Sequence, residues 1–300
     1  MRIIVTGASG FLGQAVLPLL AGHDVVATDL MLSPGVIGVP GDIADPQLQA
    51  ALFADGCDAV LHLASMPGAA VAANPARGWQ VNLHAAHDLA AQAARAGNRP
   101  RFVFASSIAV LGELPPDRSV DDATPLAPVS DYGALKAMAE CWLARQHRTG
   151  ALSVISLRLP GLVARPGAGE GFGSAFLSTM FGAIAAGRHV ELPVSAAATP
   201  WLMSVRIAAD NMVHALGVPD LTLPDIRALT LPALRPRMAE LVAAIAAHAG
   251  TQPQVHYNRQ AAVEQAFAAY PPLCSQAAIA AGFRSDETLA ALVAHAMELS

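Results

Sequence analysis

The sequence predicts an α/β protein built on a doubly wound parallel sheet, with a smaller C-terminal lobe. Three observations support this prediction. Short β-branched runs alternate with longer alanine-rich helical stretches over residues 1–160. A glycine-rich turn joins the first of these runs to the first helix. Apolar residues make up 54% of the 300 residues and charged residues only 14%, which allows a large buried core.

The predicted strands are short apolar runs, a pattern typical of strands buried on both faces of a sheet. They are Arg2–Thr6, Asp24–Asp29, Gly35–Val39, Ala59–Leu63, Arg101–Ser106 and Ser153–Leu159. The helices predicted between them are Phe11–Ala21, Pro46–Ala54, Arg77–Ala96 and Asp131–Arg148. Strands and helices that alternate in this way form right-handed crossovers, so the strands should lie parallel with helices on both faces.

The alternation changes after Pro160, where glycines and prolines cluster up to Gly173. Helices are predicted beyond this cluster at Ser174–Gly187, Val205–Leu216, Arg237–His248, Arg259–Ala269 and Asp286–Glu298, with short strands at Val190–Pro193, Arg227–Leu231 and Gln254–Tyr257. We therefore expect a sheet domain over residues 1–160, with core elements that continue to about residue 215. Residues 161–300 should form mainly the smaller lobe, which we expect to bind the substrate.

Charge and cysteine usage exclude several classes of protein. The net charge is −5 and there is no basic run, so no nucleic-acid partner is expected. No apolar stretch reaches the roughly 18 residues that a membrane span needs, and the N-terminus lacks the pattern of a signal peptide. Cys57, Cys141 and Cys274 form no CxxC pair. We therefore expect a cytoplasmic protein without a metal site.

The glycine-rich turn Thr6–Gly13 lies directly between the first strand and the first helix. Gly7 permits a tight turn, Gly10 lets the backbone approach a pyrophosphate, and Gly13 lets the helix pack on the strand. The helix N-terminus offers free N–H groups to the phosphates. The turn thus predicts a Rossmann domain that binds a dinucleotide through Gly7, Ser9, Gly10, Phe11, Leu12 and Gly13.

Acidic residues after the second and third strands favour NAD as this dinucleotide. Asp29 ends the second strand, where a carboxylate can accept hydrogen bonds from the ribose hydroxyls and repel a 2′-phosphate. The next residues, Leu30 and Met31, are not basic. Asp42, followed by Ile43, could contact the adenine amino group. Capping of a helix N-terminus is an alternative role for Asp42, and both roles can hold.

A serine, a tyrosine and a lysine form the predicted catalytic group. Ser106 and Ser107 close a predicted strand, whose carboxyl end should face the ligand crevice. Tyr132 and Lys136 are four residues apart and share a helix face. This spacing often arises by chance, so the combination with the glycine turn and the serines carries the prediction. We expect Lys136 to lower the tyrosine pKa and bind the nicotinamide ribose, and Ser107 to hold the substrate oxygen.

These motifs together resemble the extended short-chain dehydrogenases/reductases, the NAD-dependent epimerase/dehydratase family. The matching segments are the TGxxGFxG pattern at 6–13, Leu61–Ala64, Val81-Asn82, Ser106–Gly112 with Leu111 in place of the usual tyrosine, and Tyr132–Lys136. The resemblance covers residues 1 to about 215. It implies a homodimer formed through the helices 77–96 and 131–148. It further implies that NAD is contacted by Leu63, Ala64, Ser65, Asn82, Tyr132, Lys136 and Pro160.

The family contains dehydrogenases, epimerases and dehydratases, and the residues after Ser107 bear on the choice. Dehydratases carry an Asp-Glu pair there, whereas this chain has Ile108 and Ala109, so dehydration is disfavoured. A sugar or nucleotide-sugar epimerase remains an alternative, because it uses the same three residues. A cofactor-sensing protein with a degenerate site is a further alternative, and the intact Ser107, Tyr132 and Lys136 argue against it.

Two segments resemble a narrower group in this family, the D-erythronate dehydrogenases. Leu157–Gly167 is similar to its LRLPTxxxRPG segment, with Gly161 in place of the threonine, and Pro200–Arg206 is similar to the continuation. The resemblance implies NAD-dependent oxidation of a secondary hydroxyl to a keto acid. The implied substrate is a small sugar acid, D-erythronate or a similar aldonate.

A small sugar acid needs an anion anchor, for which Arg165 and Arg206 are the candidates. Arg165 could instead pair or cap within its loop. Arg158 lies inside an apolar strand, where a structural ion pair is expected. Ser174 precedes a predicted helix and could either cap it or donate to an anion. The expected substrate pocket is completed by Ser65, Ser107, Ile108 and Tyr132.

Overall fold

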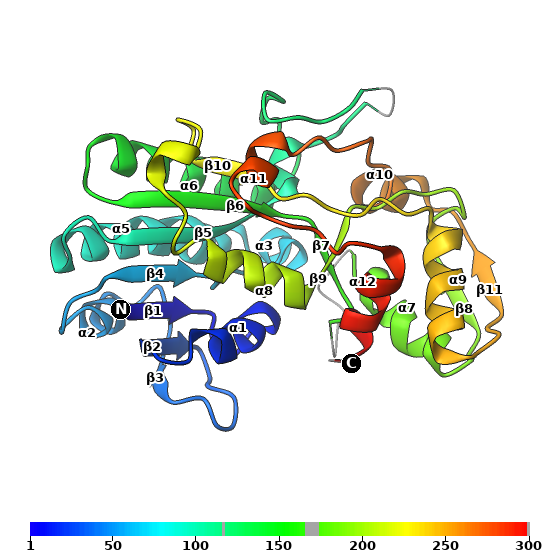
Figure 1. Cartoon of the computed structure of the whole chain (residues 1–300), viewed down its shortest axis with the longest axis horizontal. Helices are drawn as coiled ribbons and strands as arrows, with labels where there is room; N and C mark the ends of the chain where they lie inside the picture. The colour runs from blue at the N-terminus through cyan, green and yellow to red at the C-terminus, as the bar shows by residue number, and fades with distance from the viewer. Residues whose placement is uncertain (116–117, 166–173, 299–300) are drawn as a thin grey trace.

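The computed structural model describes residues 1–115, 118–165 and 174–298. Within these residues a seven-stranded sheet has the order β10-β6-β5-β4-β1-β2-β3, and every neighbouring pair is parallel (Figure 1). The strands are β1 (Arg2–Thr6), β2 (Asp24–Asp29), β3 (Gly38–Pro40), β4 (Ala59–His62), β5 (Arg101–Ser107), β6 (Ser153–Leu159) and β10 (Ala228–Thr230). This sheet confirms the predicted Rossmann fold class.

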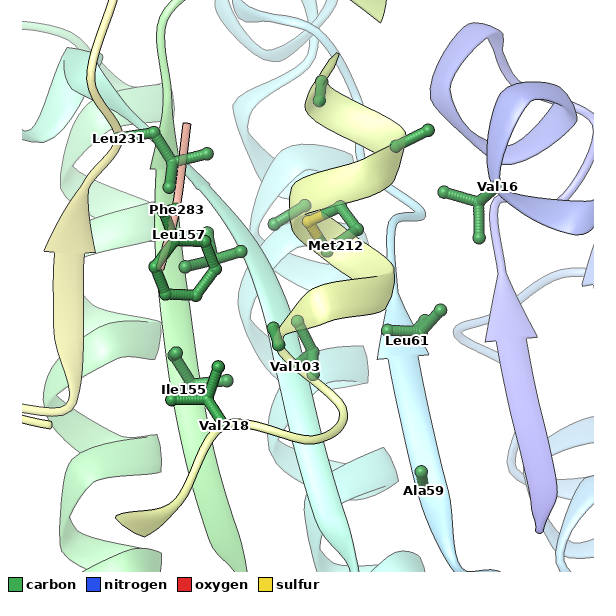
Figure 2. Close-up of a cluster of buried hydrophobic side chains, with 14 of the residues drawn as sticks. Val16, Ala59, Leu61, Val103, Ile155, Leu157, Met212, Val218, Leu231 and Phe283 are labelled. Carbon is green, nitrogen blue, oxygen red and sulfur yellow. The ribbon is translucent and has the colours of Figure 1, made fainter. Parts of the chain in front are cut away.

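One face of the sheet is covered by α1 (Phe11–Val16), α8 (Val205–His214) and α11 (Gln276–Ala280). Figure 2 shows Met212 of α8 above Val103 and Leu61 of the sheet, with Val16 of α1 beside them. These side chains are fully buried, so removal from water of their apolar surface stabilises the contact between helix and sheet.

The other face is covered by α2 (Pro46–Leu52), α5 (Ala85–Ala96) and α6 (Asp131–Arg148). The prediction of one continuous helix at Arg77–Ala96 is wrong. The segment contains three elements, namely α4 (Pro75–Trp79), a π-helical turn at Gln80–His84, and α5. Helix α4 starts earlier than predicted because Asn74 caps it and accepts a hydrogen bond from the backbone N–H of Arg77. Helix α3 (Gly68–Ala73) was not expected.

The chain after residue 160 is shared between the sheet and a second core. Strand β10 forms the edge of the main sheet beside β6, and Phe283 packs in the core under α8 (Figure 2). The second core contains Phe181, Leu241 and Leu292. It lies in the lobe on the right of Figure 1, formed by α7 (Phe176–Ala185), α9 (Met238–Ala249), α10 (Ala261–Phe267), α12 (Leu289–Met297), β8 (Val190–Leu192) and β11 (Val255–Tyr257).

A separate small pair of strands, β7 (Gly161–Val163) and β9 (Leu202–Ser204), lies between the main sheet and this lobe (Figure 1). Neither strand was expected from the sequence. Strand β7 follows β6 almost directly, and β9 leads directly into α8. The pair therefore joins the carboxyl end of the sheet to the lobe, next to the segment that carries Arg165.

Candidate active site

The site lies at the carboxyl ends of β1 and β4, where the strand order changes direction. From β1 the chain continues outward through β2 and β3, and after β4 it continues in the opposite direction through β5 and β6. In open α/β sheets a crevice forms at such a switch point, and ligands bind there. The glycine turn follows β1, and Ala64 and Ser65 follow β4, so both predicted motifs border this crevice.

The glycine turn has the geometry of a phosphate cradle. Gly7 has φ +70°, and a Cβ atom there would lie 2.6 Å from the backbone nitrogen of Ala64. Only glycine allows this approach of the turn to β4. Gly10 precedes α1 in an extended conformation, so the first N–H groups of the helix, from Phe11 to Gly13, have no acceptor within the helix. These groups fit the phosphates of a dinucleotide.

Asp29 is fixed beside this turn. Its Oδ2 accepts a hydrogen bond from the backbone N–H of Ser9 at 3.0 Å, and its Oδ1 accepts one from Leu30 at 2.7 Å. Each carboxylate oxygen keeps a second lone pair for a ribose hydroxyl. Leu30 and Met31 are exposed and apolar, so they offer no partner to a 2′-phosphate. The arrangement fits NAD.

Asp42 does not cap a helix, so the predicted alternative role of Asp42 as an N-cap residue is wrong. Helix α2 is capped by Asp45, whose side chain accepts a hydrogen bond from the backbone N–H of Gln47 at 2.8 Å. Asp42 instead accepts a hydrogen bond from Ala44 and pairs with the guanidinium of Arg77. The adjacent Ile43 is buried in the core that α2 covers.

Asn82 fixes the segment that follows β4. Its Oδ1 accepts hydrogen bonds from the backbone N–H of Met66 at 2.7 Å and from the hydroxyl of Ser65 at 3.2 Å. Its Nδ2 donates to the carbonyl of Met66 at 2.9 Å. Asn82 is buried and lies on the π-helical turn, a distortion that is frequent at functional sites. Leu63 and Ala64 precede this segment and are partly buried.

Ser107 and Tyr132 are brought together by the start of α6. Ser130 caps this helix, and a Cβ atom at Gly133 would lie 2.4 Å from the carbonyl oxygen of Ala109. The missing side chain at Gly133 therefore lets α6 approach the residues after β5. As a result the side chains of Ser107 and Ser65 come near the phenol of Tyr132, and both act to lower its pKa. Ile108, the next residue after Ser107, is buried in a separate apolar cluster.

Lys136 is buried one turn after Tyr132, with a relative exposure of 1%. Its ammonium donates to the carbonyl of Ala105 at 2.8 Å and lies 4.6 Å from the ring centroid of Phe104. The distance from Nζ to the ring centroid of Tyr132 is 5.8 Å. Burial lowers the pKa of Lys136 to about 7, and the nearby charge of Glu140 opposes this shift.

The pKa of Tyr132 differs from the expectation, because it is raised. Burial of the phenol is the main cause, and it outweighs three groups that act in the opposite direction. These groups are the hydroxyls of Ser107 and Ser65 and the positive charge of Arg165. The ammonium of Lys136 faces a carbonyl and an aromatic ring, so it does not act on the phenol in the way the helical spacing suggested.

The structure brings Arg165 into this site. Its guanidinium lies 5.4 Å from the ring centroid of Phe11 in the glycine turn, and its charge acts on Tyr132. Arg206 lies at the start of α8, exposed and paired with Glu298 at 3.3 Å. Ser174 does not begin α7, because the helix starts at Phe176 after Ala175.

Pro160 is buried between β6 and β7. Residues 166 and 167, which end the RPG segment, lie outside the described residues.

Arg158 forms the expected buried ion pair, and its partner is Glu140 of α6. The distance between Nη2 and Oε2 is 2.8 Å, and both side chains are at most 5% exposed. The hydroxyl of Ser106 also donates to Glu140. Sequence reasoning did not single out Glu140, although its position four residues after Lys136 on the same helix face was a usable signal.

Comparison with known proteins identifies the family. The profile of the NAD dependent epimerase/dehydratase family matches residues 3–220. The chain belongs to this family. Its members' shared cofactor is NAD, which agrees with the glycine turn and Asp29, and the chain is an NAD-dependent oxidoreductase. The resemblance inferred from the sequence motifs is therefore confirmed.

Two curated relatives match the chain over nearly its whole length. D-erythronate dehydrogenase from Cupriavidus necator is 31% identical, covering 99% of this chain and 98% of the relative. D-erythronate dehydrogenase from Haemophilus influenzae is 29% identical, covering 95% of each. UDP-glucose 4-epimerase from Neisseria meningitidis is 32% identical but covers 46% of each chain.

Two solved structures share the fold. A nucleoside-diphosphate-sugar epimerase from Agrobacterium tumefaciens superimposes with a TM-score of 0.88 at 23% identity, covering 99% of this chain and 94% of its own. A GalE-like L-threonine dehydrogenase from Cupriavidus necator also gives 0.88 at 20% identity, with both chains covered completely. In the described part of this epimerase/dehydratase family member, no helix is long and apolar enough to cross a membrane.

Proposed function

We propose that the chain oxidises a secondary hydroxyl of a small sugar acid, D-erythronate or a close aldonate, to the corresponding keto acid with NAD. The observation that carries this proposal is the buried phenol of Tyr132, on whose pKa the side chains of Ser107 and Ser65 and the charge of Arg165 all act. A base for a hydroxyl proton and a cation for a carboxylate thus lie side by side. The two nearly full-length D-erythronate dehydrogenase relatives support the same substrate.

In this proposal each residue has one chemical role. Tyr132 accepts the proton of the substrate hydroxyl, and Ser107 donates a hydrogen bond to the oxygen as its charge develops. Arg165 binds the carboxylate and orients the hydroxyl-bearing carbon. Lys136 is assigned to the hydroxyls of the nicotinamide ribose. NAD, when bound, would supply the hydride acceptor for this oxidation, whose products would be the keto acid, NADH and one proton.

We assign the cofactor to the crevice between β1 and β4. Residues 1–160 then form the NAD-binding domain, and residues 161–300 mainly form the substrate lobe. The residues proposed to contact NAD are Gly7, Ser9, Gly10, Phe11, Leu12, Gly13, Asp29, Asp42, Ile43, Leu63, Ala64, Ser65, Asn82, Tyr132, Lys136 and Pro160. The residues proposed to contact the sugar acid are Ser65, Ser107, Ile108, Tyr132, Arg165, Ser174 and Arg206.

A cytoplasmic homodimer completes the proposal. Helices α5 and α6 lie next to each other on one face of the sheet, and their outer surface carries Met138, which is 39% exposed, and the contacting rings of His87 and Trp142. An apolar surface of this kind suits a second copy of the chain.

The alternative function is epimerisation of a sugar or nucleotide sugar, which is favoured by the name of the family and by its epimerase members. An epimerase returns the hydride to its substrate, so it produces no net NADH. The test is therefore NADH formation with a panel of four- to six-carbon aldonic acids, beside a panel of UDP-sugars. We expect NADH with a four-carbon acid. Epimerised UDP-sugar without NADH from any acid would contradict the proposal.

A further inference from the structure

A cavity of about 700 Å³ lies at the amino ends of β5, β6 and β10, at the opposite end of these strands from the candidate active site. It is formed by the segments that lead into β5 and β10 and by the last turn of α6. Its charged and titratable lining residues are Arg99, His147, Arg148, Asp220, Asp225 and Arg227. The proposed oxidation uses none of them, so the cavity calls for an explanation of its own.

Positive charge prevails around this cavity. Its lining contains three arginines and two carboxylates. A fourth arginine, Arg101, pairs with one of these carboxylates, Asp220, at 3.3 Å. The chain as a whole carries a net charge of −5. The cavity therefore concentrates positive charge in a protein of negative net charge, and such a site attracts small anions.

Two of the arginines are held by an unfavourable backbone conformation. Arg99 has φ +53° and Arg227 has φ +55°. Within residues 1–115, 118–165 and 174–298, one other residue besides glycines has a positive φ, namely Ala164. The left-handed region is unfavourable for residues with a Cβ atom, and such strain is frequent where a protein binds a ligand. The fold thus places arginines at this cavity against their local preference.

Asp220 orients these guanidinium groups. The side chain of Arg227 is only 3% exposed, and it donates to the carbonyl of Val154 at 2.8 Å and to Oδ1 of Asp220 at 2.6 Å. Arg99 lies 2.8 Å from Oδ2 of the same carboxylate, which also accepts a hydrogen bond from Ser153. A guanidinium has five N–H groups, so both arginines keep donors for a further acceptor. The donors are therefore fixed in place before any ligand binds.

His147 adds a donor of another kind. Its Nδ1 accepts a hydrogen bond from the backbone N–H of Val154 at 3.3 Å, so in the neutral ring the hydrogen is on Nε2. Burial and the charges of Arg227, Arg99 and Arg101 lower the pKa of His147, although Asp220 acts in the opposite direction. The ring is thus neutral at neutral pH, and it feels the excess of positive charge in the cavity.

We propose that this cavity binds the phosphate group of a small phosphate monoester. Such a group carries a charge of about −1.5 to −2 and three acceptor oxygens, which suit several guanidinium forks at once. A single carboxylate offers one charge and two oxygens, and so matches the cavity less well. The volume exceeds that of a phosphate group, and Leu221 and Leu223 complete the lining, so the carbon part of the ligand also has room.

The test is calorimetric titration of the NAD-saturated protein, in which the glycine turn is already occupied. The probes are glucose 6-phosphate, AMP and inorganic phosphate, with glucose and adenosine as the uncharged counterparts. We expect one molecule of at least one monoester to bind per chain, with an affinity that falls as the salt concentration rises, and no binding of the uncharged compounds. Absence of binding for all three phosphates would overturn the proposal, as would equal binding of glucose or adenosine.

Arg148→Gln and Arg99→Gln locate the binding. Both side chains are exposed, so both variants should fold and bind NAD as the wild type does. Each loses a charge-assisted hydrogen bond to the phosphate, so we expect Kd for the monoester to rise about tenfold or more. The matched control is Arg145→Gln, because Arg145 is an exposed arginine of the same last turn of α6 and lies 5.3 Å from the ring centroid of Trp142. An equal loss of affinity in the control would overturn the proposed site.

Thermal unfolding separates binding from a purely structural role of these arginines. A ligand that binds the folded state raises Tm with its concentration. We expect the monoester to raise Tm of the wild type and of Arg145→Gln, and to have much less effect on Arg148→Gln and Arg99→Gln. If the two cavity variants have a lower Tm without ligand but the same ligand-induced rise as the wild type, the arginines stabilise the fold only and the proposal is wrong.

Discussion

Strands β5 and β6 carry a charged cluster at each end, and each cluster is centred on one carboxylate. At the carboxyl end, Ser106 and Arg158 donate to Glu140. At the amino end, Ser153 donates to Oδ1 of Asp220 at 2.6 Å. Asp220 also pairs with Arg99 at 2.8 Å, Arg101 at 3.3 Å and Arg227 at 2.6 Å.

The interactions of the amino-end cluster stabilise the ionised form of Asp220. Burial alone would raise the pKa of Asp220, but the hydrogen bond from Ser153 and the arginine charges lower it. At the carboxyl end, burial has displaced the pKa of Lys136 to about 7, next to the phenol of Tyr132. A displaced pKa beside a second titratable group is typical of a reactive site. We therefore assign the proposed chemistry to the carboxyl end of the strands and a stabilising role to the ion pairs of Asp220 at the amino end.

The largest effect should follow from Tyr132→Phe at the carboxyl end. Loss of the phenol oxygen removes the proposed base, and we expect kcat to fall by about a thousandfold with the affinity for NAD retained. The rate of NADH formation measures kcat, and a titration with NAD measures the affinity. Tyr257→Phe, in β11 of the lobe, is the control and should keep full activity. An active Tyr132→Phe enzyme would contradict the assignment of the base.

Arg165→Gln should have the next largest effect. A charge-assisted hydrogen bond to a carboxylate contributes about 1.5–3 kcal/mol, so KM for the sugar acid should rise roughly 10- to 100-fold. KM for NAD should stay unchanged. Arg237→Gln is the control, because Arg237 is exposed, paired with Glu240 and not part of the proposed site. A raised KM for NAD alone would instead assign Arg165 to the cofactor, through its position over Phe11.

Asp29→Ser should change the choice of cofactor more than the rate. The carboxylate is expected to bind the ribose hydroxyls and repel a 2′-phosphate, so its removal should lower kcat/KM for NAD about tenfold and raise that for NADP. The ratio of the two values of kcat/KM measures the effect. An unchanged ratio would show that selectivity lies elsewhere.

Asp220→Asn should have the smallest effect on activity, within about twofold, while it destabilises the fold. Asp220 is partly exposed, so we expect a loss of about 2 kcal/mol, less than for a fully buried pair. Its pKa is lowered in the folded state, so its contribution is present above the unfolded value of about 3.9 and is lost as the pH falls through the folded value. Denaturant unfolding at neutral and acidic pH measures the free energy of unfolding of both proteins. The difference between the wild type and the variant should become smaller as the pH falls.

The sequence predicted local elements better than long-range ones. Helix α6 and strand β6 have the predicted bounds, because capping residues and apolar runs define them locally. Strand β3 begins three residues later than predicted, since a turn from Ser33 to Val36, with Gly35 at φ +84°, occupies the expected start. The π-helical turn at Gln80–His84 leaves no distinct pattern in the sequence.

The same distinction applies to the site. Ser107 and Tyr132 could be predicted to meet, because one closes a strand and the other opens the next helix at the same edge of the sheet. The pair of Glu140 with Arg158 could not, since the residues are 18 apart and meet only when β6 lies beside β5. The raised pKa of Tyr132 also depends on burial that no local pattern encodes.

The most direct test of the account is the stoichiometry of the reaction with D-erythronate and NAD. We predict one NADH for each keto acid formed by the wild-type enzyme, and at most a trace of either product with Tyr132→Phe. Unchanged D-erythronate in the presence of NAD, together with conversion of a UDP-sugar to its epimer without NADH, would contradict the proposed oxidation of a sugar acid.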